Sequence, residues 1–294
     1  MNAAVVLMAY GSPERLADVP VYYADIRGGR PIPRELMDDL VERYRRLGIE
    51  DGSPLNAITE ETRAALESAL GDVPVFTGMK HWMPRIAEAA DAAVAGRADT
   101  IVGLVLAPHY SSMSIAGYRE QLEGAVGGRA ELAFIESWHD EPGFIDVLAE
   151  RVRGTDAHVV FTAHSLPARI LESGDPYKDQ LLETAQLVAE RAALETWSFS
   201  FQSESQTGEP WLGPDILDHL RELHGGGVRD VLVCPVGFVA DHLEIRWDLD
   251  HEAAELAEEL GLGFRRIEMP NADPAFVQVL AGLVRRVLAV PSEA

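Results

Sequence analysis

Short apolar runs of strand length recur along the chain and alternate with amphipathic stretches of helical spacing. The runs lie at 4–9, 73–77, 101–107, 132–135, 159–162, 197–201, 231–235 and 264–267. The amphipathic stretches include 33–47, 85–95, 142–152, 179–192 and 215–223. Strands that alternate with helices are typical of βαβ units, in which helices cover both faces of a parallel sheet. The pattern therefore predicts an α/β fold.

The eight predicted strands fall into two sets of four, separated by a polar turn near Gly154. This repetition predicts two similar Rossmann-like domains, at 1–154 and 155–294, with a cleft between them. About sixty residues separate the first strand from the second, which is far more than one crossover helix requires. We expect the insertion at about 11–60 to carry its own structure and to form a wall of the binding site.

Five histidines directly follow predicted strands: His81, His109, His139, His164 and His242. Ligands of parallel α/β sheets bind beyond the carboxyl ends of the strands. A single histidine at such a position is usually structural. Several at one edge indicate a metal or proton-transfer site, because imidazole binds metals and accepts protons near neutral pH.

Three acidic residues, Glu244, Asp248 and Glu252, follow the seventh predicted strand at intervals of four. On an α-helix this spacing stacks the carboxylates along one face, where like charges repel. On spacing alone, a solvated acidic stripe is the simpler interpretation. The position beside a strand end favours a row of oxygen ligands that holds or relays a divalent cation.

Composition and missing motifs narrow the function further. The 294 residues include 48 acidic and 25 basic side chains, and the net charge of −23 disfavours nucleic acids and anionic lipid as partners. No apolar stretch has the length of a membrane span and the first residues do not resemble a signal peptide, so we expect a cytoplasmic protein. The chain has no P-loop and no Gly-x-Gly-x-x-Gly after a strand, so a nucleotide cofactor lacks its usual cradle.

Six motifs then resemble those of ferrochelatases in order and spacing. They are MAYGSP at 8–13, LAPHYS at 106–111, TAHSLP at 162–167, GDPY at 174–177, PWLGP at 210–214 and PVGFVADHLE at 235–244. The resemblance spans nearly the whole chain, to Asn271. It implies two Rossmann-like domains around a porphyrin cleft. It also implies that Fe²⁺ is inserted as a substrate into a tetrapyrrole, with no redox cofactor or other prosthetic group.

Within that family the chain resembles the branch of Gram-positive-type bacteria that uses coproporphyrin III. The indicator is Tyr10 in Met-Ala-Tyr-Gly, where the protoporphyrin branch usually carries Asn-Leu-Gly. The resemblance implies that Tyr10 lies below the ring as a proximal contact to the metal. It implies that the porphyrin and its propionates are bound by Tyr10, Arg27, Arg43, Tyr44, Ser53 and Tyr118. We expect His81 to line the cleft as well.

The arginines of the insertion agree with this substrate. The chain as a whole is strongly negative, but six arginines lie within twenty residues of the insertion: Arg27, Arg30, Arg34, Arg43, Arg45 and Arg46. Coproporphyrin III carries four carboxylates, and guanidinium groups suit planar carboxylates. We expect at least half of these arginines simply to pair with neighbouring acids.

His164 and Glu244 are the predicted metal-handling pair. Metallation removes two protons from the pyrrole nitrogens and water from Fe²⁺. Imidazole and carboxylate can accept those protons or ligate the metal. We expect the two residues to come from opposite halves and to face one side of the ring, with Asp248 and Glu252 as an outer path for the cation. Whether His164 acts first as ligand or as proton acceptor stays open.

The predicted product is Fe-coproporphyrin III, an intermediate of haem biosynthesis. The alternatives are a protoporphyrin IX ferrochelatase, a cobalt or nickel chelatase of a reduced tetrapyrrole such as sirohydrochlorin, and a non-catalytic porphyrin carrier. Some relatives hold an iron–sulfur cluster through several cysteines, but Cys234 is the only cysteine here, so we expect no cluster. We expect a monomer, with a later haem-pathway enzyme as a candidate partner.

Overall fold

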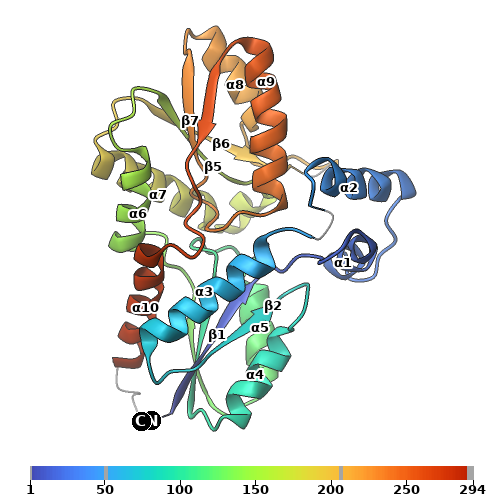
Figure 1. Cartoon of the computed structure of the whole chain (residues 1–294), viewed down its shortest axis with the longest axis vertical. Helices are drawn as coiled ribbons and strands as arrows, with labels where there is room; N and C mark the ends of the chain where they lie inside the picture. Colours follow the sequence, from blue (N-terminus) through green and yellow to red (C-terminus); the bar gives the residue numbers. More distant parts are fainter. Residues whose placement is uncertain (1, 50–51, 205–207, 290–294) are drawn as a thin grey trace.

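Two four-stranded parallel sheets lie one above the other along the long axis of the molecule (Figure 1). The computed structural model describes residues 2–49, 52–204 and 208–289. Residues 50–51 of the predicted insertion and the last five of the second predicted domain therefore lie outside the described residues. The strand orders are β2-β1-β3-β4 and β6-β5-β7-β8. The predicted α/β fold with two similar halves is confirmed.

The first sheet is built on a buried, largely apolar central pair of strands. Its elements are β1 (Ala3–Ala9), β2 (Val75–Met79), β3 (Thr100–Val105) and β4 (Glu131–Ile135), with helices α3 (Leu55–Leu70), α4 (Ile86–Ala95), α5 (Ile115–Val126) and α6 (Pro142–Val152). All six residues of β3 are buried, as are six of the seven in β1. Helices cover both faces of a parallel sheet, so its central strands show no polar alternation.

The second sheet repeats this arrangement with one irregular helix. Its elements are β5 (His158–His164), β6 (Trp197–Gln202), β7 (Asp230–Cys234) and β8 (Gly263–Arg266), with η2 (Ala168–Ser173), α7 (Tyr177–Ala192), α8 (Ile216–Gly225), the π-helix η3 (Ile245–Ala253), α9 (Ala254–Leu260) and α10 (Pro274–Ala289). A helical segment follows the seventh strand, and its nine residues Ile245–Ala253 form a π-helix. The spacing of its acids therefore does not follow α-helical geometry.

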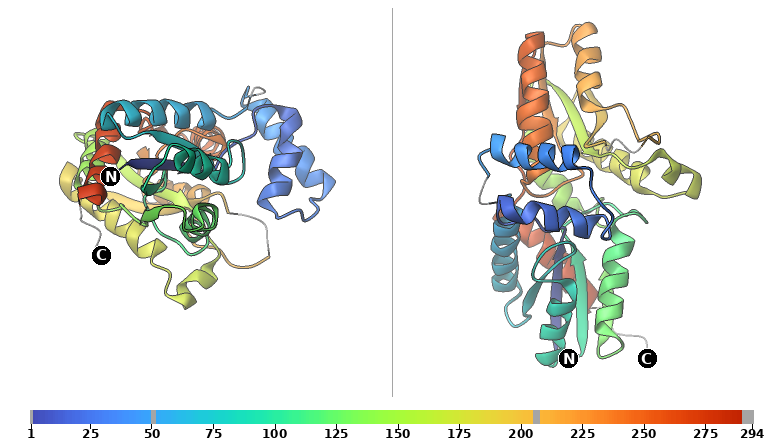
Figure 2. Two further views of the ribbon diagram at one scale, coloured as in Figure 1. Left: turned by 90° about the horizontal axis from the view of Figure 1, so that it is seen from below. Right: turned by 90° about the vertical axis from the view of Figure 1, so that its right-hand side faces the viewer.

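The predicted insertion forms its own small unit beside the sheets. A short 3₁₀ turn η1 (Leu16–Asp18) leads into α1 (Val19–Ile26) and α2 (Arg34–Arg46). Val19, Tyr44 and Ile49 form its buried centre, and Leu243 of the second half packs against this cluster. Figure 2 shows α1 and α2 at the level where the two halves meet. The insertion is thus held against the segment that carries Glu244.

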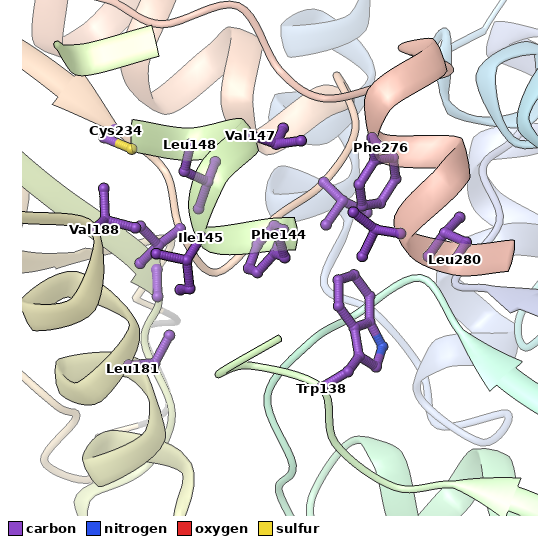
Figure 3. Close-up of a cluster of buried hydrophobic side chains, with 14 of the residues drawn as sticks. Trp138, Phe144, Ile145, Val147, Leu148, Leu181, Val188, Cys234, Phe276 and Leu280 are labelled. Carbon is purple, nitrogen blue, oxygen red and sulfur yellow. The ribbon is translucent and has the colours of Figure 1, made fainter. Parts of the chain in front are cut away.

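The two halves share one continuous core (Figure 3). Helix α6 packs against α7 of the second half, whereas α10 packs against α3 of the first. Trp138, Phe144 and Phe276 meet at this junction, with ring centroids 5.1 to 6.4 Å apart. Each half is therefore completed by a helix from the other. The division at residue 154 stays a prediction.

None of the helices within the described ranges combines the length and apolar character needed to cross a bilayer.

Candidate active site

His164 and Glu244 lie side by side at the carboxyl edge of the second sheet. His164 ends β5, and Glu244 directly precedes the π-helix that follows β7, the neighbour of β5. The His164 Nδ1 and Glu244 Oε2 atoms are 3.1 Å apart, and the two side chains are 31% and 39% exposed. The predicted pair is therefore formed, at the position where α/β folds bind ligands. The expectation that the two residues come from opposite halves was wrong, since β5 and β7 belong to one sheet.

Gly237 allows the loop after β7 to approach His164. A Cβ atom at this position would lie 2.5 Å from Ala163 Cβ and 2.8 Å from Ala163 Cα. The backbone N–H of Gly237 donates to the Thr162 carbonyl at 3.1 Å. Only glycine fits this close approach of the loop to β5.

Burial and charge act against each other on the pair. Burial lowers the pKa of His164, but the charge and hydrogen bond of Glu244, with the charge of Asp248, raise it above the ordinary value. Burial alone would raise the pKa of Glu244, but His164 and His242 hold it well below its usual range. Glu244 is therefore a stable carboxylate beside a readily protonated imidazole.

Asp248 lies deeper than Glu244 and has the opposite electrostatic character. It is 8% exposed and accepts hydrogen bonds from Gln202 Nε2 at 3.3 Å and from Ser203 Oγ. Burial, followed by the negative charge of Glu244, raises its pKa to about 7. A carboxyl with this pKa gains or loses a proton near neutral pH. Glu252 adds its negative charge to the surroundings of Asp248.

Tyr10 lies at the end of β1 and is the exposed aromatic residue of the site. Its side chain is 41% exposed, and its ring centroid is 4.6 Å from that of His81. His81 Nδ1 is 2.9 Å from Asp25 Oδ2, and Arg85 makes two bonds to the same carboxylate. Burial, and then the charge of Glu244, raise the pKa of Tyr10. Tyr10 is therefore within electrostatic reach of Glu244, across the boundary between the halves.

The remaining predicted porphyrin-binding residues lie in different environments. Tyr44 and Ser53 are buried, and the Nε atom of Arg27 is buried without a hydrogen-bond partner. Arg43 pairs with Asp39 at 3.1 Å and lies over the Trp247 ring, 5.1 Å from its centroid. These contacts connect the insertion to the π-helix.

Tyr118 belongs to the buried core of the first half. The Lys80 ammonium lies 4.7 Å from the centroid of its ring and donates to the Ser114 carbonyl at 3.1 Å. Lys80 therefore lies against the ring of Tyr118, which is only 5% exposed.

The six arginines of the insertion mostly pair within it. Arg34, Arg43, Arg45 and Arg46 each form an ion pair with an acid of α2. This agrees with the expectation that at least half of them pair with neighbouring acids.

The five strand-end histidines do not form one cluster. His242 joins the pair, with Nε2 3.7 Å from Glu244 Oε2, and His81 lies with Tyr10. His109 and His139 form a separate pair, with ring centroids 6.0 Å apart, and both make hydrogen bonds to side chains of α7. Burial lowers the pKa of His109 to about 3, so it stays neutral. Within the described parts of the chain, no three His, Cys, Asp or Glu side chains are arranged to hold a metal ion.

The first residue of α7 and the loop before it support the backbone of His164. Tyr177 Oη donates to the His164 carbonyl at 3.0 Å. Asp175 accepts from Ser111 Oγ and from the N–H and Oγ of Ser112, which follow β3 of the first half. No role was predicted from the sequence for Tyr177, Asp175 or Gln202. His242 was noted only as a strand-end residue, although its place two residues before Glu244 was a usable signal.

The model of the ferrochelatase family matches residues 2–288. The chain belongs to the ferrochelatase family. Among its relatives are ferrochelatases of Deinococcus radiodurans, 41% identical, and Herpetosiphon aurantiacus, 43% identical; each alignment covers 96% of this chain and 95% and 98% of the relative. A coproporphyrin III ferrochelatase of Halalkalibacterium halodurans is 40% identical over 97% of both chains. The chain is therefore a metal chelatase of haem biosynthesis with porphyrin and iron as substrates.

Solved structures confirm the fold at low sequence identity. SirB from Bacillus subtilis with Fe³⁺ has a TM-score of 0.63 at 12% identity and covers 98% of this chain and 96% of its own. CbiX, described as the terminal enzyme of sirohaem biosynthesis in denitrifying bacteria, has a TM-score of 0.55 at 15% identity, with 99% and 100% covered. At these identities the likeness concerns the fold alone.

Proposed function

We propose that this ferrochelatase inserts Fe²⁺ into coproporphyrin III and releases Fe-coproporphyrin III. Relatives named coproporphyrin III ferrochelatase, about 40% identical over nearly their full length, support this substrate. So does Tyr10, exposed at the end of β1 in the motif of that branch. Arg27 and Arg43 of the insertion are the proposed partners of the propionates, because guanidinium groups bind carboxylates in two-pronged geometry.

The 3.1 Å contact between His164 and Glu244 carries the mechanistic proposal. Insertion of Fe²⁺ releases two protons from the porphyrin, so the site needs proton acceptors beside a ligand for the cation. The pair supplies an imidazole that takes a proton readily and a carboxylate that stays ionised. Asp248, with a pKa of about 7, is a further proton acceptor close to neutral pH. Together these groups can take up the released protons while Glu244 presents a hard oxygen ligand to Fe²⁺.

Tyr10 and His81 are proposed to contact the ring from the side of the first half. The tilted stack of Tyr10 on His81 holds the phenol ring in place, and Asp25 with Arg85 holds His81. Asp248 and Glu252 are proposed to relay the cation toward Glu244. We further propose that the enzyme works in the cytoplasm as a monomer without a prosthetic group, and that a later enzyme of haem synthesis receives the product.

An anaerobic metallation assay tests the substrate. Coproporphyrin III, protoporphyrin IX and sirohydrochlorin are each offered with Fe²⁺ or Co²⁺, and the metallated products are identified by absorbance. We expect kcat/KM with Fe²⁺ to be at least tenfold higher for coproporphyrin III than for the other two. An equal or higher value for protoporphyrin IX would refute the proposed substrate but not the family.

Two variants test the site in the same assay. His164→Ala and Glu244→Gln should lower kcat on the order of 10²-fold or more, since each removes a group that handles protons or metal. Porphyrin affinity, measured by quenching of tryptophan fluorescence, should change little. Turnover near the parent rate in either variant would remove that residue from the proposed mechanism.

A further inference from the structure

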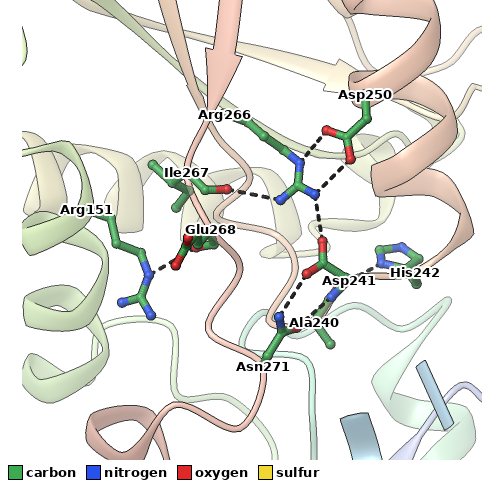
Figure 4. A network of polar contacts seen from close by, with 9 residues as sticks. All are labelled: Arg151, Ala240, Asp241, His242, Asp250, Arg266, Ile267, Glu268 and Asn271. Carbon is green, nitrogen blue, oxygen red and sulfur yellow. Dashed lines mark hydrogen bonds and ion pairs between the residues drawn. The ribbon is translucent and has the colours of Figure 1, made fainter. Parts of the chain in front are cut away.

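Arg266 bridges the two ends of the segment that carries Glu244 and Asp248 (Figure 4). Its Nη2 atom lies 2.7 Å from Asp241 Oδ1, three residues before Glu244. Its Nε and Nη2 atoms lie 2.6 and 2.9 Å from the two oxygens of Asp250, two residues after Asp248. One guanidinium group therefore clamps both ends of the stretch 241–250.

The clamp is rigid and largely shielded from water. Arg266 Nη1 also donates to the Ile267 carbonyl at 3.1 Å, and the Arg266 side chain is only 16% exposed. Arg266 ends β8, and the next residue is bonded to β7 through Ile267 N and Val233 O at 3.0 Å. The guanidinium is thus fixed to the sheet that also carries His164 on β5.

Asn271 secures the first end of the stretch independently. Its side chain accepts from the Asp241 N–H and donates to Asp241 Oδ2, each at 2.8 Å. Its own N–H donates to the Val239 carbonyl at 2.8 Å. Both oxygens of Asp241 therefore have fixed partners, and the loop that leads to Glu244 has a defined position.

Charge gives the clamp a second effect. Four carboxyl groups lie within ten residues, those of Asp241, Glu244, Asp248 and Asp250. The first two precede the π-helix and the last two lie within it. Neighbouring carboxylates repel one another, and a π-helix is itself an uncommon conformation. Arg266 neutralises the two outer members, so the two inner ones remain available for the site.

We propose that Arg266 is a positioning residue for metallation, which holds Glu244 and Asp248 at their working distance from His164. The proposal rests on the function assigned above to Glu244 and Asp248. Arg266 acts on them through Asp241 and Asp250, to which its guanidinium group is bonded. Misplacement of reacting groups by about 1 Å can lower a rate on the order of 10²-fold.

The experiment compares Arg266→Gln and Arg266→Lys with the matched control Arg265→Gln. Arg265 precedes Arg266 on the same strand but is 51% exposed and pairs with Asp230 and Thr155. Both Gln variants remove one positive charge from β8. The full-length protein is assayed anaerobically with coproporphyrin III while the Fe²⁺ concentration is varied. Porphyrin affinity and the melting temperature are measured on each sample, with Glu244→Gln in parallel.

For Arg266→Gln we expect kcat/KM for Fe²⁺ to fall on the order of 10- to 100-fold, with porphyrin affinity within about twofold of the parent. Arg266→Lys should recover only part of the loss, because an ammonium group cannot bridge two carboxylates in the geometry of a guanidinium fork. Arg265→Gln should stay within about twofold of the parent in kcat/KM for Fe²⁺ and in porphyrin affinity, and its melting temperature should change little.

Equal kcat/KM for Fe²⁺ in Arg266→Gln and Arg265→Gln would overturn the proposal. So would a loss of porphyrin affinity in Arg266→Gln as large as its loss of kcat/KM for Fe²⁺. If Arg266→Gln does not fold, Arg266→Lys decides: parent-like iron kinetics would reduce the clamp to a role in folding. If Glu244→Gln is fully active, the proposed function fails instead. If metallation activity falls in Glu244→Gln but not in Arg266→Gln, only the positioning role of Arg266 is refuted.

Discussion

Replacing Asp248 with asparagine should stabilise the fold at neutral and alkaline pH while it weakens metal delivery. The carboxyl is 8% exposed, and its pKa rises from 3.8 to about 7 on folding. The folded state therefore binds this proton more tightly than the unfolded chain, so stability falls as pH rises from about 4 to about 7. Asparagine keeps the shape of the side chain but cannot ionise.

The size of the effect follows from the difference in pKa between the folded and the unfolded chain. A tenfold change in proton affinity corresponds to about 1.4 kcal/mol, so ionisation of buried Asp248 costs about 4 kcal/mol at pH values above 7. Near pH 5, where the folded-state carboxyl is still protonated, the cost is about 2 kcal/mol. Poorer hydrogen bonds to Gln202 and Ser203 should cost the variant about 1 kcal/mol. Asp248→Asn should therefore exceed the parent by about 3 kcal/mol near pH 8 and by about 1 kcal/mol near pH 5.

Equilibrium unfolding in urea at these two pH values, followed by tryptophan fluorescence, measures both differences. Asp72→Asn, at an exposed position before β2, is the control for loss of one carboxylate, and its stability should stay within about 0.5 kcal/mol of the parent. The Fe²⁺ concentration needed for half-maximal rate should rise in Asp248→Asn. A variant that is less stable than the parent near pH 8, or whose advantage does not depend on pH, would refute the electrostatic reasoning.

Three further outcomes are expected. In Glu244→Gln the pKa of His164 should fall, because the main carboxylate that counteracts its burial is gone; an unchanged imidazole titration by NMR would contradict this. Gly237→Ala should cost about 1–3 kcal/mol of stability by overpacking and should slow metallation. The control Gly124→Ala, in open space on α5, should stabilise the fold by about 0.5–1 kcal/mol, and urea unfolding measures both differences. Phe276→Ala should cost about 3–5 kcal/mol, and the two halves should still unfold together because the core is shared; two separate transitions in calorimetry would show that they do not.

Much of the fold follows from local pattern. All eight strands were predicted within a few residues, because parallel strands covered on both faces need apolar side chains along their whole length. The long connection after β1 indicates an insertion, because connections between strands and helices in such folds are usually short. The motifs single out His164 and Glu244, and the structure places their Nδ1 and Oε2 atoms 3.1 Å apart.

Several features depended on contacts between residues far apart in the chain. The exchange of α6 and α10 between the halves is set by which apolar faces fit together, and their amphipathic patterns are compatible with either sheet. The sequence does not predict the π-helix after β7, because its residues follow an ordinary helical pattern. Its position depends on contacts with a distant strand, since Arg266 of β8 bonds to Asp250 within the π-helix and to Asp241 before it. The assignment of His164 and Glu244 to opposite halves was wrong, because both residues lie in the predicted domain 155–294 and follow neighbouring strands, β5 and β7, of one sheet.

The division between local and tertiary information is clearest at the carboxylates of 244–252. Their spacing and types are visible in the chain, and so is the kind of chemistry that such groups perform. Their individual roles depend on burial and on neighbours from other strands: Glu244 stays ionised beside two imidazoles, whereas Asp248 takes up a proton near neutral pH among Gln202, Ser203 and Glu244. The physical reason is that the ionisation of a carboxyl depends on desolvation and on nearby charges, and both arise only when distant segments pack together.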